Sequence, residues 1–165
     1  MNKWIIGIAI VALLFVAFIA YEPSRQETNS TDVFDGFQIV YKVETPGAST
    51  HEMQLAQNGT FLNAYYEKSG TQSDSHSKSL DSGQVAHFRK LLGALNVESL
   101  QERYTCGTKL ENYDPIKTIS IKSNSFKKTI RIDDWTCTDI PSTLKELVGN
   151  IQKIDFEMRG ILTNQ

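Results

Sequence analysis

Two cysteines are the first residues whose type and number suggest a chemistry. They stand in similar settings, Tyr104-Thr105-Cys106 and Trp135-Thr136-Cys137. They could form a disulfide, act as reactive thiols or supply half of a metal site. The compartment decides between these interpretations, because oxidising compartments permit disulfides. A bridge would close a loop of about 30 residues and stabilise the fold by roughly 3–4 kcal/mol. We predict a disulfide between Cys106 and Cys137.

The remaining metal-ligand residue types do not form a recognisable site. The three histidines, His51, His76 and His87, fall in different predicted elements, and neither C-x-x-C nor H-E-x-x-H occurs. Asp74 and His76 could share one side of an extended segment, but structural zinc usually has four protein ligands. We therefore expect no metal and no other cofactor.

Nucleophilic and carboxylate chemistry is also weakly supported. Five serines surround His76, at positions 69, 73, 75, 77 and 79. No G-x-S-x-G elbow occurs, and the polar segment 68–79 is typical of a mobile loop or a polar edge strand. Asp133 and Asp134 form a carboxylate pair that could suggest glycoside chemistry, but we interpret them as solvated turn residues. No catalytic residue is predicted, and a small hydrolase using His76 or His87 is an alternative.

A cluster of basic residues between positions 115 and 132 is more distinctive, because this segment contains no acidic residue. Several of them should share the outward face of an antiparallel pair. Such a surface could bind an anionic envelope polymer, lipid headgroups or an acidic partner; alternatively, it is a solvent-facing strand kept charged to prevent edge pairing. The candidate binding residues are Lys117, Lys122, Lys127, Lys128 and Arg131.

The overall charge argues against one class of partner. The chain carries 17 basic and 19 acidic side chains, a formal net charge of −2. Nucleic-acid-binding domains are usually basic. We predict no nucleic-acid partner.

The amino-terminal residues predict a membrane anchor. Residues 4–21 contain no charge, and as a helix they would be roughly 27 Å long, close to the ~30 Å hydrocarbon core. A cleaved signal peptide is the alternative, but no small-x-small cleavage site ends the segment. Lys3 precedes it and mainly acidic residues follow, so we expect the amino terminus inside and the rest of the chain outside the cell membrane.

The chain accordingly divides into four parts. We predict a single-pass anchor over residues 1–21 and a polar linker over 22–32, which lacks large apolar residues. A single extracytoplasmic domain over 33–158 and a tail over 159–165 follow.

Hydropathy patterns indicate the elements that must position these residues. Alternation predicts strands over 36–44, 51–56 and 60–67, with Asn58-Gly59 as a hairpin turn, and a second hairpin over 116–132. Apolar stripes predict helices over 80–95 and from Pro141 onward. The predicted fold is α+β, an antiparallel sheet of about five to six strands with two helices packed on one face, preceded by one transmembrane helix.

Two segments carry a resemblance to known proteins. SLDSGQVAHFRKLL (79–92) and IPSTLKELVGNIQKI (140–154) bracket the second hairpin. This order resembles small exported proteins of the emfourin type, which inhibit thermolysin-like metallopeptidases, and extracytoplasmic lipoprotein domains without an assigned activity. The resemblance covers most of residues 36–154 in spacing and apolar pattern and transfers no functional residue. It implies protease inhibition as an alternative function.

The sequence therefore predicts a membrane-tethered, extracytoplasmic, non-catalytic binding or accessory domain. Its predicted partners are the membrane, through the amino-terminal helix, and an envelope polymer or a protein. The exported protease inhibitor and the small hydrolase stay as alternatives.

Overall fold

The computed structural model describes residues 34–106 and 114–160. The predicted anchor (1–21), the linker (22–32) and the end of the tail (161–165) lie outside the described residues. Within the described ranges, no helix is long and apolar enough to cross a membrane.

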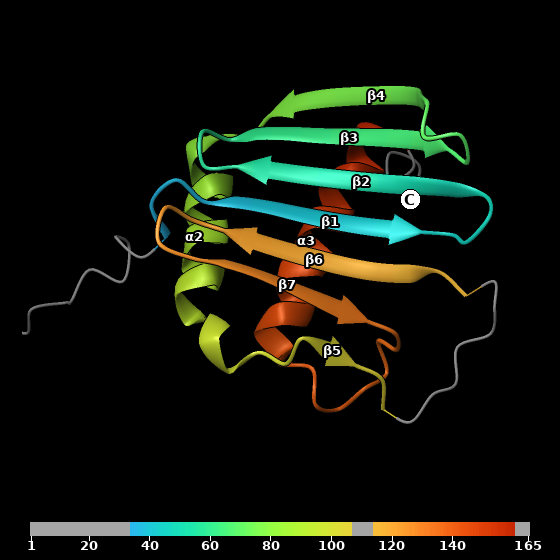
Figure 1. Cartoon of the computed structure of the whole chain (residues 1–165). Helices are drawn as coiled ribbons and strands as arrows, with labels where there is room; N and C mark the ends of the chain where they lie inside the picture. Colours follow the sequence, from blue (N-terminus) through green and yellow to red (C-terminus); the bar gives the residue numbers. More distant parts are fainter. Residues whose placement is uncertain (1–33, 107–113, 161–165) are drawn as a thin grey trace, which may run out of the picture. The chain divides into compact units, whose positions relative to one another are not determined.

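Seven strands form one open, mostly antiparallel sheet in the order β4-β3-β2-β1-β6-β7-β5 (Figure 1). The parallel pair β5–β7 is the exception to the antiparallel arrangement. The strands are β1 (Gln38–Glu44), β2 (Ser49–Ala56), β3 (Thr60–Glu67), β4 (Gln72–Ser79), β5 (Arg103–Tyr104), β6 (Ile116–Lys122) and β7 (Lys127–Ile132).

Two helices, α2 (Ser82–Ala94) and α3 (Ser142–Met158), cover one face of this sheet, as Figure 1 shows. A short 3₁₀ helix, Val97–Ser99, follows α2. The predicted α+β class and the two helices on one face are confirmed. The expected strand number was too low, because β5 is only two residues long and such a segment has no periodicity to detect.

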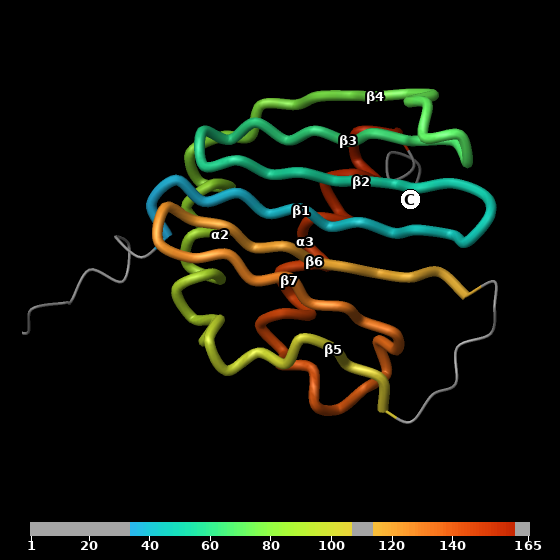
Figure 2. Tube along the Cα trace, viewed as in Figure 1, coloured from blue at the N-terminus to red at the C-terminus, as the bar shows by residue number. Residues whose placement is uncertain are grey.

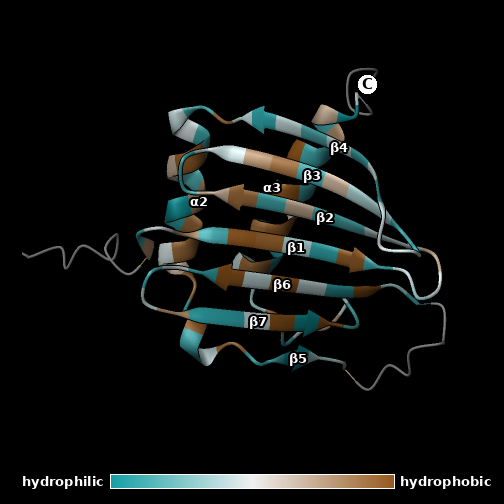
Figure 3. Cartoon of the chain, turned by 45° about the horizontal axis from the view of Figure 1, so that its top comes forward, coloured by the Kyte–Doolittle hydropathy of each residue, from teal (hydrophilic) through white to brown (hydrophobic). Residues whose placement is uncertain are grey.

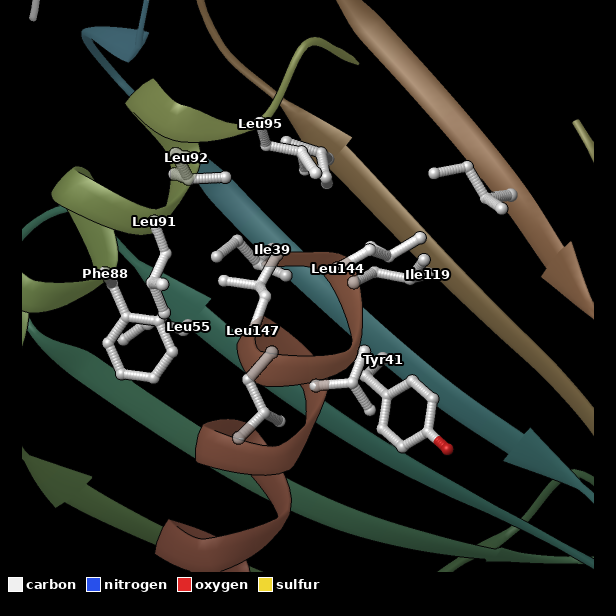
Figure 4. Packing of buried hydrophobic residues seen from close by; sticks show 14 of the residues in the cluster. Ile39, Tyr41, Leu55, Phe88, Leu91, Leu92, Leu95, Ile119, Leu144 and Leu147 are labelled. Carbon is white, nitrogen blue, oxygen red and sulfur yellow. The ribbon is translucent and has the colours of Figure 1, made fainter. Parts of the chain in front are cut away.

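The core lies between the sheet and the two helices. Ile39, Leu55 and Ile119 are fully buried on the helix-facing side, and Figure 4 shows them beside Leu144 and Leu147 of α3. Alternate residues of the same strands therefore project from the opposite face, which no described helix covers. Figure 3 shows this alternation along β6, as brown bands separated by pale or teal ones.

Local signals set the turns and the helix start. In the β2–β3 turn, Gly59 has a φ of +84°, which glycine adopts without strain, and Gly59 N donates to Ala56 O. A capping box precedes α2, since the side chains of Asp81 and Gln84 each accept from the other residue's backbone N–H. The last helix has Pro141 as its N-cap, directly before its first residue.

The two edges of the sheet are formed by very different strands. The trace in Figure 2 places β4 at one edge and the short β5 beside β7 at the other. The serine-rich segment is thus an edge strand, one of the two structures expected for it. Its pairing with β3 has one irregularity, between Tyr65 and Tyr66.

Candidate functional site

The five predicted basic residues divide between the two faces of the sheet. Lys117 lies opposite Ile132, and Lys128 lies opposite Ile121. Because directly opposed residues share a face and both isoleucines are fully buried under the helices, these two lysines belong to the helix-covered side.

Lys122, Lys127 and Arg131 lie on the uncovered face. Lys122 and Lys127 are directly opposed across the β6–β7 hairpin, and both are exposed. Arg131 follows on the same side of β7, next to Arg103 of β5. The expectation that several basic residues share the outward face therefore applies to three of the five.

A buried carboxylate organises the two arginines. Asp133 Oδ2 accepts from Arg103 Nε at 2.6 Å, and Asp133 Oδ1 accepts from Arg131 Nε at 2.6 Å. The Asp133 side chain is only 1% exposed, whereas the side chains of Arg103 and Arg131 are 55% and 35% exposed. Each guanidinium is thus held at its Nε, and the described part of the chain offers its terminal nitrogens no further hydrogen-bond partner.

The electrostatics of Asp133 follow from these contacts. Burial by itself would raise the pKa of this carboxyl group, but the hydrogen bonds and positive charges of Arg131 and Arg103 outweigh burial and lower the pKa below its ordinary value. Asp133 is therefore ionised at neutral pH. The carboxylate keeps both arginines in place and neutralises only part of their charge.

The cations that β5, β6 and β7 place on the uncovered face are Arg103, Lys122, Lys127 and Arg131, and we call this group the basic strip. The neighbouring strands are mixed in charge. On β1, Lys42 and Glu44 form an ion pair at 2.9 Å, and Glu52 stands opposite Lys42 on β2. The positive excess is therefore confined to β6, β7 and β5.

Sequence reasoning missed two members of this arrangement. Asp133 was interpreted as a solvated turn residue, which is wrong, because it is buried and bound by two arginines. Arg103 lies 28 positions before Arg131 and reaches it through the short parallel pair β5–β7. A usable signal was the spacing of Asp133 two residues after Arg131, which places both side chains on one face of an extended segment.

The predicted disulfide is present at the same edge. Cys106 and Cys137 are bridged with their Cα atoms 5.4 Å apart, and Cys137 is buried. The bridge ties the residues after β5 to the loop after β7. The bridge does not lie directly at the feet of the β6–β7 hairpin, because β5 lies on the far side of β7 from β6. Disulfides are typical of oxidising compartments, which supports an extracytoplasmic domain.

A second polar cluster lies under β2 and β3, at the end of α3. Asp155 is buried and accepts from Asn63 Nδ2 and from Arg159 at 2.5 Å. His51 Nε2 lies 3.1 Å from Asn63 Oδ1 and 3.4 Å from Asp155 Oδ1. The His51 ring stacks on Tyr65, with centroids 4.1 Å apart. Burial first, and the charge of Asp155 second, raise the pKa of Tyr65.

This second cluster joins the carboxyl-terminal end of α3 to the sheet. Among the described residues, the hydrogen-bond and ion-pair partners of His51 are Asn63 and Asp155, so the histidine makes no hydrogen bond to a hydroxyl or thiol there. Asp155 was also missed in the sequence. Its position four residues after the buried Ile151 marked a carboxylate in the apolar stripe of α3.

The other two histidines lie apart from these clusters. His76 is on β4 and contacts the exposed Asp74 at 3.0 Å. His87 is on α2, where its ring meets Phe88 edge-on. The structure therefore does not bring the three histidines together.

Neither comparison relates the chain to a known family: no protein-family model matches it, and a search among curated proteins found no match.

Proposed function

We propose that this protein is a non-catalytic binding domain, and that its basic strip holds an extended anionic polymer on the uncovered face of the sheet. The observation that carries the proposal is the pair of arginines fixed on Asp133. Among the residues that the structure describes, both guanidinium groups are bound through Nε alone, and their terminal nitrogens are the groups that we propose to contact the ligand. Guanidinium groups make strong, bidentate hydrogen bonds to carboxylates and phosphates.

The arrangement of the strip supports an extended ligand. On β7, Lys127 and Arg131 are four residues apart, which corresponds to roughly 13–14 Å along a strand. Both lie on the uncovered face, and Arg103 widens the strip at one end while Lys122 widens it at the other. A polymer with regularly repeated anionic groups can contact both ends at once, whereas a single small anion can contact only one.

The proposed setting is the outer side of a membrane. The uncharged residues 4–21 would anchor the chain, and residues 22–32 would act as a flexible tether. Tethering keeps a domain at a high effective concentration near the membrane surface. An anionic polymer of the cell envelope is the ligand class that fits this setting.

Binding of labelled linear polyphosphate and of labelled polyglutamate to the full-length chain in detergent micelles tests the proposal. We expect at least one of these polymers to bind and the double variant Arg103→Gln, Arg131→Gln to bind it about tenfold more weakly, since charge-assisted hydrogen bonds are lost. The matched control is Lys117→Gln, Lys128→Gln, which removes the same charge from the helix-covered side and should keep the affinity within about twofold, as the polymer does not contact those residues.

Because the arginine variant also removes the partners of Asp133, a second variant keeps the test independent of folding. Lys122→Gln, Lys127→Gln leaves the Asp133 contacts intact and should also weaken binding. Equal losses in the control and in the strip variants would indicate general charge attraction and overturn the proposal. So would the absence of polymer binding, or exclusive binding to phosphatidylglycerol vesicles.

A further inference from the structure

The strand β4 forms a long edge that the described part of the chain leaves uncovered. It pairs with β3 on one side only. Seven of its eight residues are exposed, the exception being Lys78. Four serines and no proline occur in it, and Figure 3 shows it pale or teal along its length. Natural edge strands are commonly protected by proline, bulges, shortness or charged side chains, and the charged residues of β4 are Asp74 and Lys78.

One hydrogen bond shows which residues of β4 turn their backbone groups toward β3 and which turn them outward. Leu80 N donates to Gly59 O at 2.9 Å, so the even-numbered residues of β4 turn their backbone groups toward β3. In an antiparallel ladder, the backbone N–H and C=O groups of the alternate residues point away from the partner strand. Ser75, Ser77 and Ser79 therefore present N–H and C=O groups outward. The irregularity opposite Tyr65 and Tyr66 affects only the start of the strand and leaves residues 74–79 in regular register.

The side chains of this segment are complementary to a second copy of itself. A two-fold axis at His76 places Asp74 of each copy opposite Lys78 of the other, so two equivalent pairs of opposite charge form. Ser75 then meets Ser77 of the other copy, and these outward-facing residues become hydrogen-bonded pairs. Asp74 and Lys78 form the non-hydrogen-bonded pairs, in which side chains approach most closely and opposite charges stabilise the pairing.

Neighbouring registers lack this match. An axis at Ser75 places Lys78 opposite Gln72, and an axis at Ser77 places Lys78 opposite His76. The ion-pair partners that Asp74 and Lys78 have within one chain do not prevent them from pairing with a second copy. Lys78 Nζ lies 3.6 Å from a carboxylate oxygen of Glu157, and Asp74 Oδ2 lies 3.0 Å from His76 Nε2. All four side chains are more than a third exposed, at 36–57%. Exposed ion pairs contribute little.

We propose that two copies of this protein associate through their β4 edges, antiparallel and centred on His76, so that the two sheets become one continuous sheet. The inference is independent of the function proposed for the basic strip, which lies at the other edge. The partner is a second copy because the charge pattern of residues 74–78 is complementary to its own reversal.

Cysteine cross-linking of the full-length chain in detergent micelles, with copper phenanthroline as the oxidant, tests the pairing. In the proposed register the two copies of residue 76 are opposed, with Cα atoms about 4.5 Å apart, within the range for a disulfide. His76→Cys should therefore form covalent dimers. The matched control, Ser75→Cys, is equally exposed on the next residue, but its two copies are roughly 7–8 Å apart and should cross-link about tenfold more slowly.

Charge changes in the His76→Cys background test the register. Asp74→Lys alone and Lys78→Asp alone should each suppress cross-linking, whereas the double exchange should restore it. Circular dichroism melts verify that each variant is folded, and peptide mapping verifies that the Cys106–Cys137 bridge is intact. No dimer, equal cross-linking at positions 75 and 76, or insensitivity to the single charge reversals would each overturn the proposal.

Discussion

The two edges of the sheet differ in how much holds them in place. At the β5–β7 edge, a disulfide and a buried carboxylate bound to two arginines connect residues that are about thirty positions apart. At the β4 edge, the side-chain contacts of the strand with other elements include the exposed ion pair of Lys78 with Glu157. One edge is closed by covalent and ionic links, and the other presents small polar side chains and backbone groups that no described strand pairs.

The difference shows that two sheet edges can serve separate purposes. The short strand β5 contributes little pairing of its own, so its position depends on tertiary links. Those links also hold the arginines of the basic strip. The strand β4 is long enough to be held by its ladder with β3 alone, and its outer side stays available. Changes at the two edges should therefore have very different effects on stability.

Removal of the disulfide should have the largest effect. We expect Cys106→Ser together with Cys137→Ser to lower the free energy of unfolding by about 3–4 kcal/mol, because the bridge restricts the unfolded chain by closing a loop of this length. Urea denaturation monitored by tryptophan fluorescence measures the loss. A change below about 1 kcal/mol would show that the β5–β7 edge does not depend on the bridge.

Replacement of Asp133 should have an intermediate effect that depends on pH. Asp133→Asn should cost about 1–2 kcal/mol at neutral pH, a value reduced by the partial exposure of both arginines. Because the pKa of Asp133 is lowered in the folded state, its contribution is present above the unfolded carboxyl pKa of about 3.9 and is lost as pH falls below that value toward the folded pKa.

Unfolding midpoints recorded from pH 7 down to pH 2.5 measure this dependence. The wild-type protein should lose more stability on acidification than the Asp133→Asn variant. The control is Asp74→Asn at the β4 edge, whose side chain is 57% exposed and which should follow the wild-type curve. Parallel curves for the wild type and Asp133→Asn would contradict the assigned role of the carboxylate.

The smallest effect is expected at β4. Lys78→Ala removes the ion pair with Glu157, and we expect the free energy of unfolding to change by less than about 0.5 kcal/mol. The measurement is made at low protein concentration, so that association of copies does not contribute. A loss above about 1 kcal/mol would show that the β4 edge is held more firmly than its contacts indicate.

Much of the fold could be predicted from local patterns. Alternating apolar residues identified β1, β6 and β7, and the Asn58-Gly59 turn located the β2–β3 hairpin. The Asp81 capping box marked the start of α2. These signals are readable because strand and helix periodicities, turn conformations and cap hydrogen bonds each depend on residues close in sequence.

The candidate site was predicted only in part, for an equally physical reason. The basic composition of the hairpin was visible, but its five basic residues were treated as one group, although alternation with Ile119 and Ile130 indicates which of them share the isoleucine face. Lys117 and Lys128 were therefore grouped with residues on the opposite side of the sheet. Asp155 was overlooked because its partner Asn63 comes from β3, although its other partner, Arg159, lies only four residues farther along the chain.

The sequence by itself determined the α+β class, the two helices, the hairpins and the pairing of the two cysteines, since two cysteines allow only one intramolecular bridge. The pairing of β5 with β7 and the contact of Arg103 with Asp133 became visible only in the three-dimensional structure. Such contacts join residues far apart in the chain, and their formation depends on how the whole sheet packs, which no local pattern encodes.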